Sequence, residues 1–247
     1  IDEANRANIA GADYVEVRFD KLYLIKPEPT ISENEEGEKI SKMPPETEWA
    51  VKDFKDIDIE KSISSLKEAI PVPVIFTVRP VREGGFFAGN EKERLEVLSK
   101  AIESEVSFVD LELSIDEKER KKLHANASNS GCKVIASHHD SSSTPSADEI
   151  IEIVRSNYDK GDIMKFCSSI SNHQDSLQII EAAHTLSSDD DPRSLMGLGN
   201  GGDWVRLHAP ILDQSLVYAT MLNHFRLSDR GLINVRDLRD AWALLEY

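Results

Sequence analysis

The chain has 247 residues, and its 29 Lys and Arg against 45 Asp and Glu give a formal net charge of −16 at pH 7. This acidity argues against a nucleic-acid partner, because a protein that neutralises phosphates needs a basic face. Hydrophobic residues make up 40 %, which excludes global disorder, and their longest runs are too short to predict a membrane span.

Short apolar runs alternate with longer stretches of helical periodicity. The runs are rich in Val, Ile and Phe, which is typical of parallel strands covered on both faces. They lie at residues 14–19, 72–78, 106–113, 133–137, 162–167, 194–198 and 215–220, with helical stretches at 2–9, 90–104, 146–158 and 173–186. The pattern predicts an α/β fold in a single domain over residues 1–247, one strand short of a (β/α)8 barrel. Ser146 and Glu149 predict a capping box.

Residues 25–50 break this alternation. They hold four of the ten prolines and have no clear period, and their acidic cluster consists of Glu33, Glu35, Glu36 and Glu38. We expect a long, partly disordered surface insertion after the first visible strand. A solvated acidic segment is the simplest interpretation, and a partner-binding segment is the alternative.

Three of the strand runs carry charges at their carboxyl ends, where an ordinary buried parallel strand is apolar. Spacing by two residues places successive charges on the same side of a strand. A structural ion pair explains any one of them best, but together they predict a polar ligand site. The charged residues are Glu16, Arg18 and Asp20, then Arg79, Arg82 and Glu83, then Asp110 and Glu112.

Three residues on the next two strands suit acid–base and covalent chemistry. His138 and His139 are adjacent and face opposite ways, so at most one of them serves the same site, and the usual pKa of a histidine near neutrality suits proton transfer. Lys165 lies within an apolar run, where burial would lower its pKa and make the amine a nucleophile for a Schiff base. The alternative is a lysine that reaches out to solvent.

The motifs of common cofactors are weak or missing. Gly197, Gly199 and Gly202 match a dinucleotide spacing, but no acidic ribose partner follows them. We expect this loop to face an anionic ligand, with Arg206 binding its carboxylate or phosphate. The two cysteines, Cys132 and Cys167, form neither a disulfide framework nor a zinc motif, which predicts a reducing, cytoplasmic compartment.

In their order and spacing, these motifs resemble those of the type I 3-dehydroquinate dehydratase family. The similar segments run from Glu16-Val-Arg18-Phe-Asp20 through Arg79 and Glu83-Gly-Gly to Ser137-His-His139-Asp, and end at Lys165. The resemblance implies a (β/α)8 barrel that dehydrates 3-dehydroquinate to 3-dehydroshikimate through an imine, a step of the shikimate pathway. It also implies a small-molecule substrate, no metal or cofactor, and a homodimer.

The resemblance also implies roles for individual residues. Lys165 would form the Schiff base, His139 would transfer the protons, and Glu83 would orient His139. The rest of the implied substrate pocket comprises Glu16, Arg18 and Arg79 for the hydroxyls, Arg206 for the carboxylate, and Met196 and Ser228 as lining residues.

The two ends of the chain depart from the family pattern. The spacing from Met196 to Arg206 is longer than usual, and Leu232 stands where the lid motif has a glutamine. Only a helix-like stretch precedes the first visible strand, so we expect a barrel that lacks its first strand. The alternative functions are an aldolase-like Schiff-base lyase acting on a phosphosugar, and a non-catalytic barrel derived from the enzyme.

Overall fold

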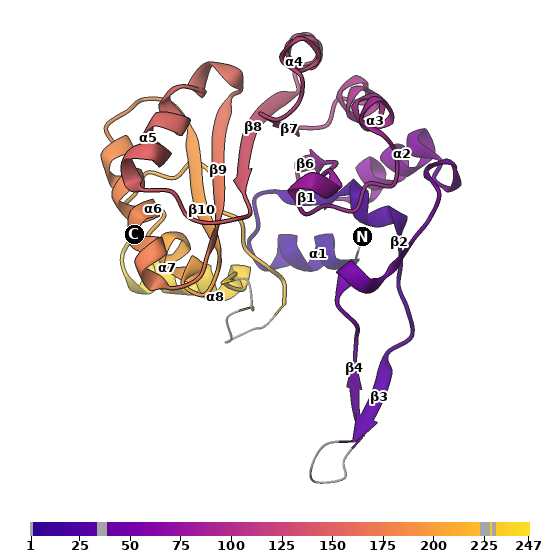
Figure 1. Ribbon diagram of the computed structural model, residues 1–247, viewed down its shortest axis with the longest axis horizontal. Coiled ribbons are helices and arrows are strands. Elements are labelled where there is room, and N and C mark those ends of the chain that lie inside the picture. The colour runs from indigo at the N-terminus through magenta and orange to yellow at the C-terminus, as the bar shows by residue number, and fades with distance from the viewer. Residues whose placement is uncertain (1, 34–38, 223–227, 229–230) are drawn as a thin grey trace.

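A curved parallel sheet organises the molecule (Figure 1). The structure is a computed structural model that describes residues 2–33, 39–222, 228 and 231–247. Within these ranges, strands that follow one another along the chain pair in the order β1-β6-β7-β8-β9-β10. They are β1 (Val15–Arg18), β6 (Val74–Thr77), β7 (Phe108–Glu112), β8 (Lys133–Asp140), β9 (Ile163–Ile170) and β10 (Arg193–Gly199). This order, with helices as crossovers, is that of a (β/α)8 barrel, which confirms the predicted fold class.

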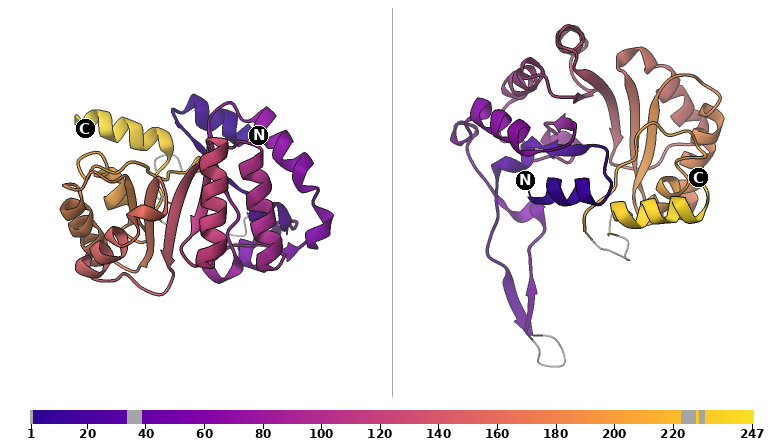
Figure 2. Two further views of the ribbon diagram at one scale, coloured as in Figure 1. Left: turned by 90° about the horizontal axis from the view of Figure 1, so that it is seen from above. Right: turned by 180° about the vertical axis from the view of Figure 1, so that it is seen from behind.

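Helices cover the outer face of the sheet (Figure 2). They are α1 (Asp2–Ile9), α2 (Ile59–Ala69), α3 (Glu91–Glu103), α4 (Glu117–Ser130), α5 (Ala147–Arg155), α6 (His173–Leu186), α7 (Gly202–Leu207) and α8 (Val235–Leu244). The predicted capping box is confirmed, because the Ser146 side chain accepts the backbone N–H of Glu149 and the Glu149 carboxylate accepts that of Ser146. No helix in the described ranges has the length and apolar character needed to cross a membrane.

The core lies between the sheet and these helices. One cluster joins Phe76 and Val109 of the sheet to Leu98 of α3. A second cluster joins Phe166 of β9 to Ile150 of α5 and Ile179 of α6. All six side chains are almost completely buried, and burial of side chains this size contributes about 1.5–3 kcal/mol each. This packing fixes the strands whose carboxyl ends carry the charged residues.

The prediction of a strand at residues 215–220 is wrong. The segment runs beside β10, but it pairs only through the isolated bridge between Thr220 and Asn234. Side chains take backbone groups that a ladder would use: Gln214 accepts the Leu195 N–H through Oε1 at 2.6 Å, and the Ser194 hydroxyl donates to the Leu216 carbonyl at 2.6 Å. The described sheet therefore ends at β1 on one side and at β10 on the other.

The segment at 25–50 is more ordered than the sequence predicts. β3 (Thr30–Glu33) and β4 (Lys39–Lys42) form an antiparallel hairpin that projects from the body (Figure 1). At its base, β2 (Leu24–Ile25) pairs with β5 (Ala50–Val51). Three members of the predicted acidic cluster, Glu35, Glu36 and Glu38, lie outside the described residues. Short 3-10 helices complete the chain: η1 (Phe19–Tyr23), η2 (Glu46–Glu48), η3 (Phe54–Asp56), η4 (Val81–Glu83) and η5 (Tyr158–Lys160).

A cavity of about 580 Å³ lies between β1 and residues 214–222. Residues of α1 and α8 also line it, and Arg239 of α8 donates to the Gly11 carbonyl and to Asp13 at 2.8 and 2.6 Å. At this opening α8 therefore contacts the loop that follows α1, and the two helices lie near each other (Figure 2). The sheet is open where the sequence predicts a missing strand.

Candidate active site

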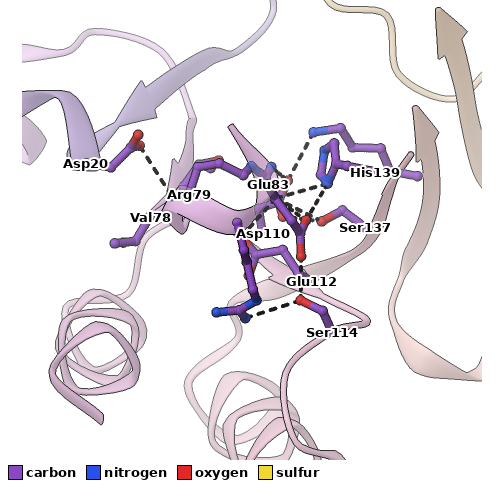
Figure 3. Close-up of polar contacts among 12 residues, drawn as sticks. Asp20, Val78, Arg79, Glu83, Asp110, Glu112, Ser114, Ser137 and His139 are labelled. Atoms are coloured by element: carbon purple, nitrogen blue, oxygen red, sulfur yellow. Dashed lines mark hydrogen bonds and ion pairs between the residues drawn. The ribbon is translucent and has the colours of Figure 1, made fainter. Parts of the chain in front are cut away.

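The carboxyl ends of β1, β6, β7, β8 and β9 bring the charged residues together inside the curve of the sheet. In the ladder, Glu112 of β7 stands opposite Ser137 of β8, which stands opposite Lys165 of β9. The close-up shows side chains from these strands converging on Arg79 and His139 (Figure 3). The carboxyl ends of barrel strands are where active sites occur in this fold class.

Lys165 is buried and touches an acid and an aromatic ring. Its Nζ donates to Asp110 Oδ2 at 3.1 Å and lies 4.4 Å from the centroid of the Tyr218 ring. Burial, the largest effect, lowers the pKa of Lys165, but Asp110 and Tyr218 outweigh it, and the pKa lies above its usual value. The predicted lowering is therefore wrong in the ligand-free protein. The amine rests as an ammonium and must lose a proton before it can act as a nucleophile.

Asp110 is the centre of the buried charge network. Its Oδ2 also accepts Arg79 Nη2 at 3.0 Å, and its Oδ1 accepts the Ser137 hydroxyl. Burial is the largest single effect and raises the pKa of Asp110. The cations Arg79 and Lys165 together outweigh it, so the pKa lies below its usual value and the carboxylate stays ionised. A fully buried carboxylate is tolerated only with such partners.

His139 has two competing neighbours at one ring nitrogen. Its Nδ1 lies 2.9 Å from Glu83 Oε2 and 3.2 Å from Arg79 Nη1. Burial is the main cause that lowers the pKa of His139 to about 4, against the hydrogen bond to Glu83, which raises it. The imidazole is therefore neutral near pH 7 and can accept a proton. His138 stacks instead on the ring of Phe166, 5.7 Å away between centroids.

A tight turn after β6 places Glu83 beside His139. Gly84 ends η4 with a φ of 75°, which favours glycine, and a Cβ on Gly85 would lie 2.0 Å from the Arg79 carbonyl oxygen. The Glu83 carboxylate accepts the Ser114 hydroxyl and lies 3.6 Å from Arg79 Nη1. Burial raises the pKa of Glu83, but the hydrogen bonds from His139 and Ser114 bring it below its usual value.

Two further predicted residues lie on β1. Glu16 accepts the Thr77 hydroxyl at 2.8 Å and lines the cavity. Arg18 forks onto Asp20 with distances of 2.9 and 2.7 Å, and Asp20 also accepts the backbone N–H of Arg79 at 3.3 Å. The Arg18 side chain keeps 22 % of its surface exposed, so part of it is accessible to solvent.

Arg206, for which the resemblance implies a substrate carboxylate as partner, contacts backbone carbonyls through Nε and Nη1, and its role in binding the substrate stays a prediction. Arg206 is buried, and it donates to the carbonyls of Tyr218, Gly197 and Gly202 at 2.6–2.8 Å. This binds it to the backbone of the glycine loop. Gly199 is required there by packing, because its φ is 134° and a Cβ would lie 2.1 Å from the Ile170 carbonyl oxygen.

The last two predicted residues contact other groups. Met196 is buried on β10, where it lies with Arg206 and Tyr218 around a small space. The Ser228 hydroxyl accepts the backbone N–H of Leu232 at 2.9 Å. Their roles as lining residues stay predictions.

Comparison with known proteins decides the family. The model of the type I 3-dehydroquinase family matches residues 1–247. The chain belongs to this family. A 3-dehydroquinate dehydratase from Methanocaldococcus jannaschii is 31 % identical over 194 residues, which cover 77 % of this chain and 85 % of the relative. One from Haloquadratum walsbyi is 33 % identical over 160 residues, 64 % of this chain and 65 % of the relative.

Solved structures share the type I 3-dehydroquinase fold. A type I 3-dehydroquinate dehydratase from Clostridium difficile aligns with a TM-score of 0.77 at 21 % identity, covering 99 % of this chain and 85 % of that one. The 3-dehydroquinate dehydratase from Aquifex aeolicus gives 0.71 at 20 % identity, covering 98 % and 91 %. At this identity the likeness establishes the barrel fold of the family.

Asp110 and Tyr218 contact Lys165, although Asp110 was predicted only as one charge of the polar ligand site and Tyr218 was not predicted at all. The signal for Asp110 was present, because it is a charge within a buried strand. Tyr218 gave no signal, because residues 215–220 looked like an ordinary apolar strand.

Replacing Asp110→Asn should lower the pKa of Lys165, because it removes the strongest charge that raises it. At about pH 9 the amine should then be acetylated at least about tenfold faster than in the parent, since one pKa unit changes the neutral fraction tenfold. Peptide mapping measures this. Asp213→Asn, which alters the exposed partner of Arg193, is the control. Equal acetylation of Lys165 in all three proteins would contradict the assigned cause.

Proposed function

We propose that this chain is a 3-dehydroquinate dehydratase that works through a Schiff base on Lys165. The observation that carries the proposal is the meeting of a buried lysine and a neutral histidine around one buried acid network, in a chain of the type I 3-dehydroquinase family. Such a pair supplies both groups that imine-based dehydration needs.

The reaction balances with these residues and the substrate alone. The deprotonated Lys165 amine attacks the ketone carbon, and loss of water leaves an iminium that acts as an electron sink. His139 takes the α-proton through Nε2, and the electron pair moves to the iminium. His139 then returns a proton to the departing β-hydroxyl, which leaves as water. Addition of water to the imine releases the product and restores the amine.

Other residues would hold the substrate and the histidine. Glu83 accepts Nδ1–H of His139, which leaves Nε2 free to act as the base. Glu16 and Arg18 are proposed to bind hydroxyls from β1. Arg79 is already engaged by Asp110 and Glu112, so a substrate hydroxyl would replace its longest hydrogen bond, the one to Ser137 at 3.4 Å.

Incubation of the purified 247-residue chain with 3-dehydroquinate tests the proposal. The conjugated enone of 3-dehydroshikimate should appear in the ultraviolet spectrum, and mass spectrometry should show loss of one water. Cleavage of a phosphosugar without dehydration would favour the aldolase-like alternative. A folded chain without either activity would favour the non-catalytic barrel.

Leu232→Gln should lower KM or leave it unchanged. Leu232 is half-buried beside Ser228, and a glutamine amide there gains hydrogen-bonding groups that leucine lacks. Steady-state kinetics with 3-dehydroquinate provide the measurement, and Leu222→Gln, at an exposed position before the same loop, is the control. A large rise in KM would show that the lid works by another geometry.

A further inference from the structure

Arg94 on α3 is a buried arginine of the charge network that the mechanism does not use. Its Nη1 donates to Glu112 Oε2 at 2.7 Å and to the Val78 carbonyl at 2.9 Å. Its Nε and Nη2 fork onto Glu91 at 3.0 and 2.7 Å. The guanidinium is almost completely buried, and Glu91 keeps 41 % of its side-chain surface exposed. Arg94 thus connects the interior of the site to the protein surface.

Glu112 is shared between two arginines. Its Oε2 accepts Arg94, and its Oε1 accepts Arg79 Nη1 at 2.8 Å. With one oxygen committed to each arginine, the carboxylate is fixed in orientation and presents a single acceptor to Arg79. Without Arg94, the fully buried Glu112 would lose one of the two cations that oppose the effect of burial on its pKa, so it would protonate more readily and hold Arg79 less strongly.

Arg79 competes for the ring nitrogen that Glu83 must hold. Nδ1 of a neutral histidine either donates its hydrogen to Glu83 or accepts one from Arg79, but cannot do both. Only the first arrangement leaves Nε2 unprotonated, so that it can act as a base. When Glu112 releases Arg79 Nη1, the remaining partners of this nitrogen are His139 at 3.2 Å, the Ser137 hydroxyl at 3.4 Å and Glu83 at 3.6 Å. A closer contact to His139 or to Glu83 weakens the bond between Glu83 and His139.

A second set of contacts leads to the same histidine. Glu91 also pairs with Arg82 at 2.9 Å, Arg82 Nη2 donates to the Ser114 hydroxyl at 3.2 Å, and Ser114 donates to Glu83. The two sets meet at Glu91 and at His139, so they form a closed ring. In order, its members are His139, Glu83, Ser114, Arg82, Glu91, Arg94, Glu112 and Arg79. Figure 3 shows the inner part of this ring.

We infer that Arg94 is a positioning residue that, through Glu112 and Arg79, keeps His139 protonated at Nδ1 and so leaves Nε2 as the base. The catalytic part of this inference rests on the proposed dehydratase function. Arg94 acts through other residues and not on the substrate itself, because its hydrogen-bond partners are Glu112, Val78 and Glu91.

Nitrogen-15 NMR of labelled histidines tests the inference independently of activity. His139 is assigned from the signals that disappear in His139→Gln. The parent should show Nδ1–H, and Arg94→Met should shift His139 toward Nε2–H. Arg94→Lys should restore part of the parent signal, because one ammonium can pair with Glu112 without forking onto Glu91. An unchanged tautomer in Arg94→Met would overturn the inference.

Kinetics separate positioning from folding. Arg94→Met should lower kcat by about 10- to 100-fold, less than the 10²–10⁴-fold of losing a proton-transfer group, while KM and borohydride trapping of Lys165 stay close to the parent. Arg120→Met is the matched control, because Arg120 is also a buried helix arginine but donates to the Lys160 carbonyl, away from the ring. The same loss of kcat in this control would overturn the inference.

Glu91→Gln covers the case in which Arg94→Met does not fold. Glu91 is partly exposed, and this variant weakens both sets of contacts. It should shift the His139 tautomer in the same direction, and an unchanged tautomer counts against the inference. A parent protein that does not dehydrate 3-dehydroquinate would refute the proposed function alone, because the tautomer is measured without substrate.

Discussion

Lys165→Ala should lose turnover of 3-dehydroquinate by more than about 10⁴-fold, because the variant lacks the amine that would form the covalent bond to the substrate. Borohydride added with substrate should leave the reduced ligand mass on Lys165 in the parent and none at residue 165 in the variant. Lys133→Ala is the control, because Lys133 also lies over an aromatic ring, that of Phe108 at 5.8 Å, but is exposed at the start of β8. An adduct on another lysine of the parent would refute the assignment.

The pH dependence of trapping follows from the raised pKa of Lys165. Below that pKa, the neutral fraction of the amine rises tenfold with each pH unit. The rate of adduct formation should therefore increase from neutral to alkaline pH in the parent. In Asp110→Asn the same rise should begin at lower pH. A trapping rate that falls as the pH rises would show that deprotonation of Lys165 does not limit imine formation.

His139→Ala should cut turnover by about 10²–10⁴-fold, the usual cost of removing a general acid–base group. His138→Ala should retain most activity, since His138 stacks on Phe166 rather than contacting Glu83. Steady-state kinetics of the two variants give the comparison, and each is the control for the other. The reverse pattern would mean that the assignment of the two histidines is wrong.

The acid limb of the parent's pH profile tests the lowered pKa of His139. Its pKa of about 4 means that the base is lost by protonation only as the pH falls through about 4. At saturating substrate, where the imine is already formed, activity should therefore persist below pH 6, where an exposed histidine would already be protonated. An acid limb centred near 6.5 would show that His139 is far less buried in solution.

Local sequence patterns were sufficient for much of the fold. Apolar runs marked all six strands of the main sheet, because parallel strands covered on both faces must be apolar wherever they lie. The hairpin of β3 and β4 was missed because its pairing of Thr30 with Lys42 joins polar, exposed residues that give no periodic signal. The prediction of a strand at 215–220 was wrong because an apolar run forms a strand only where a neighbouring strand pairs with its backbone.

The site was only partly predictable. The resemblance paired Glu83 with His139 across the chain, and the structure places the two side chains in contact. The direction in which the pKa of Lys165 shifts could not be predicted. It depends on a carboxylate oxygen 3.1 Å from Nζ, and no spacing in the sequence indicates that contact. The same holds for the contacts of Arg206, whose Nη1 donates to two carbonyls of a loop that only the fold brings near.

The cavity beside β1 bears on how long a covalent intermediate would survive. An imine persists only while water is kept away from it. Glu16 and Tyr218 line this cavity, and Lys165 Nζ lies 4.4 Å from the centroid of the Tyr218 ring, so water that approached the imine from this side would have to pass that ring. The lifetime of the intermediate would then depend on how tightly α1 and α8 cover that side, through the contact of Arg239 with Asp13.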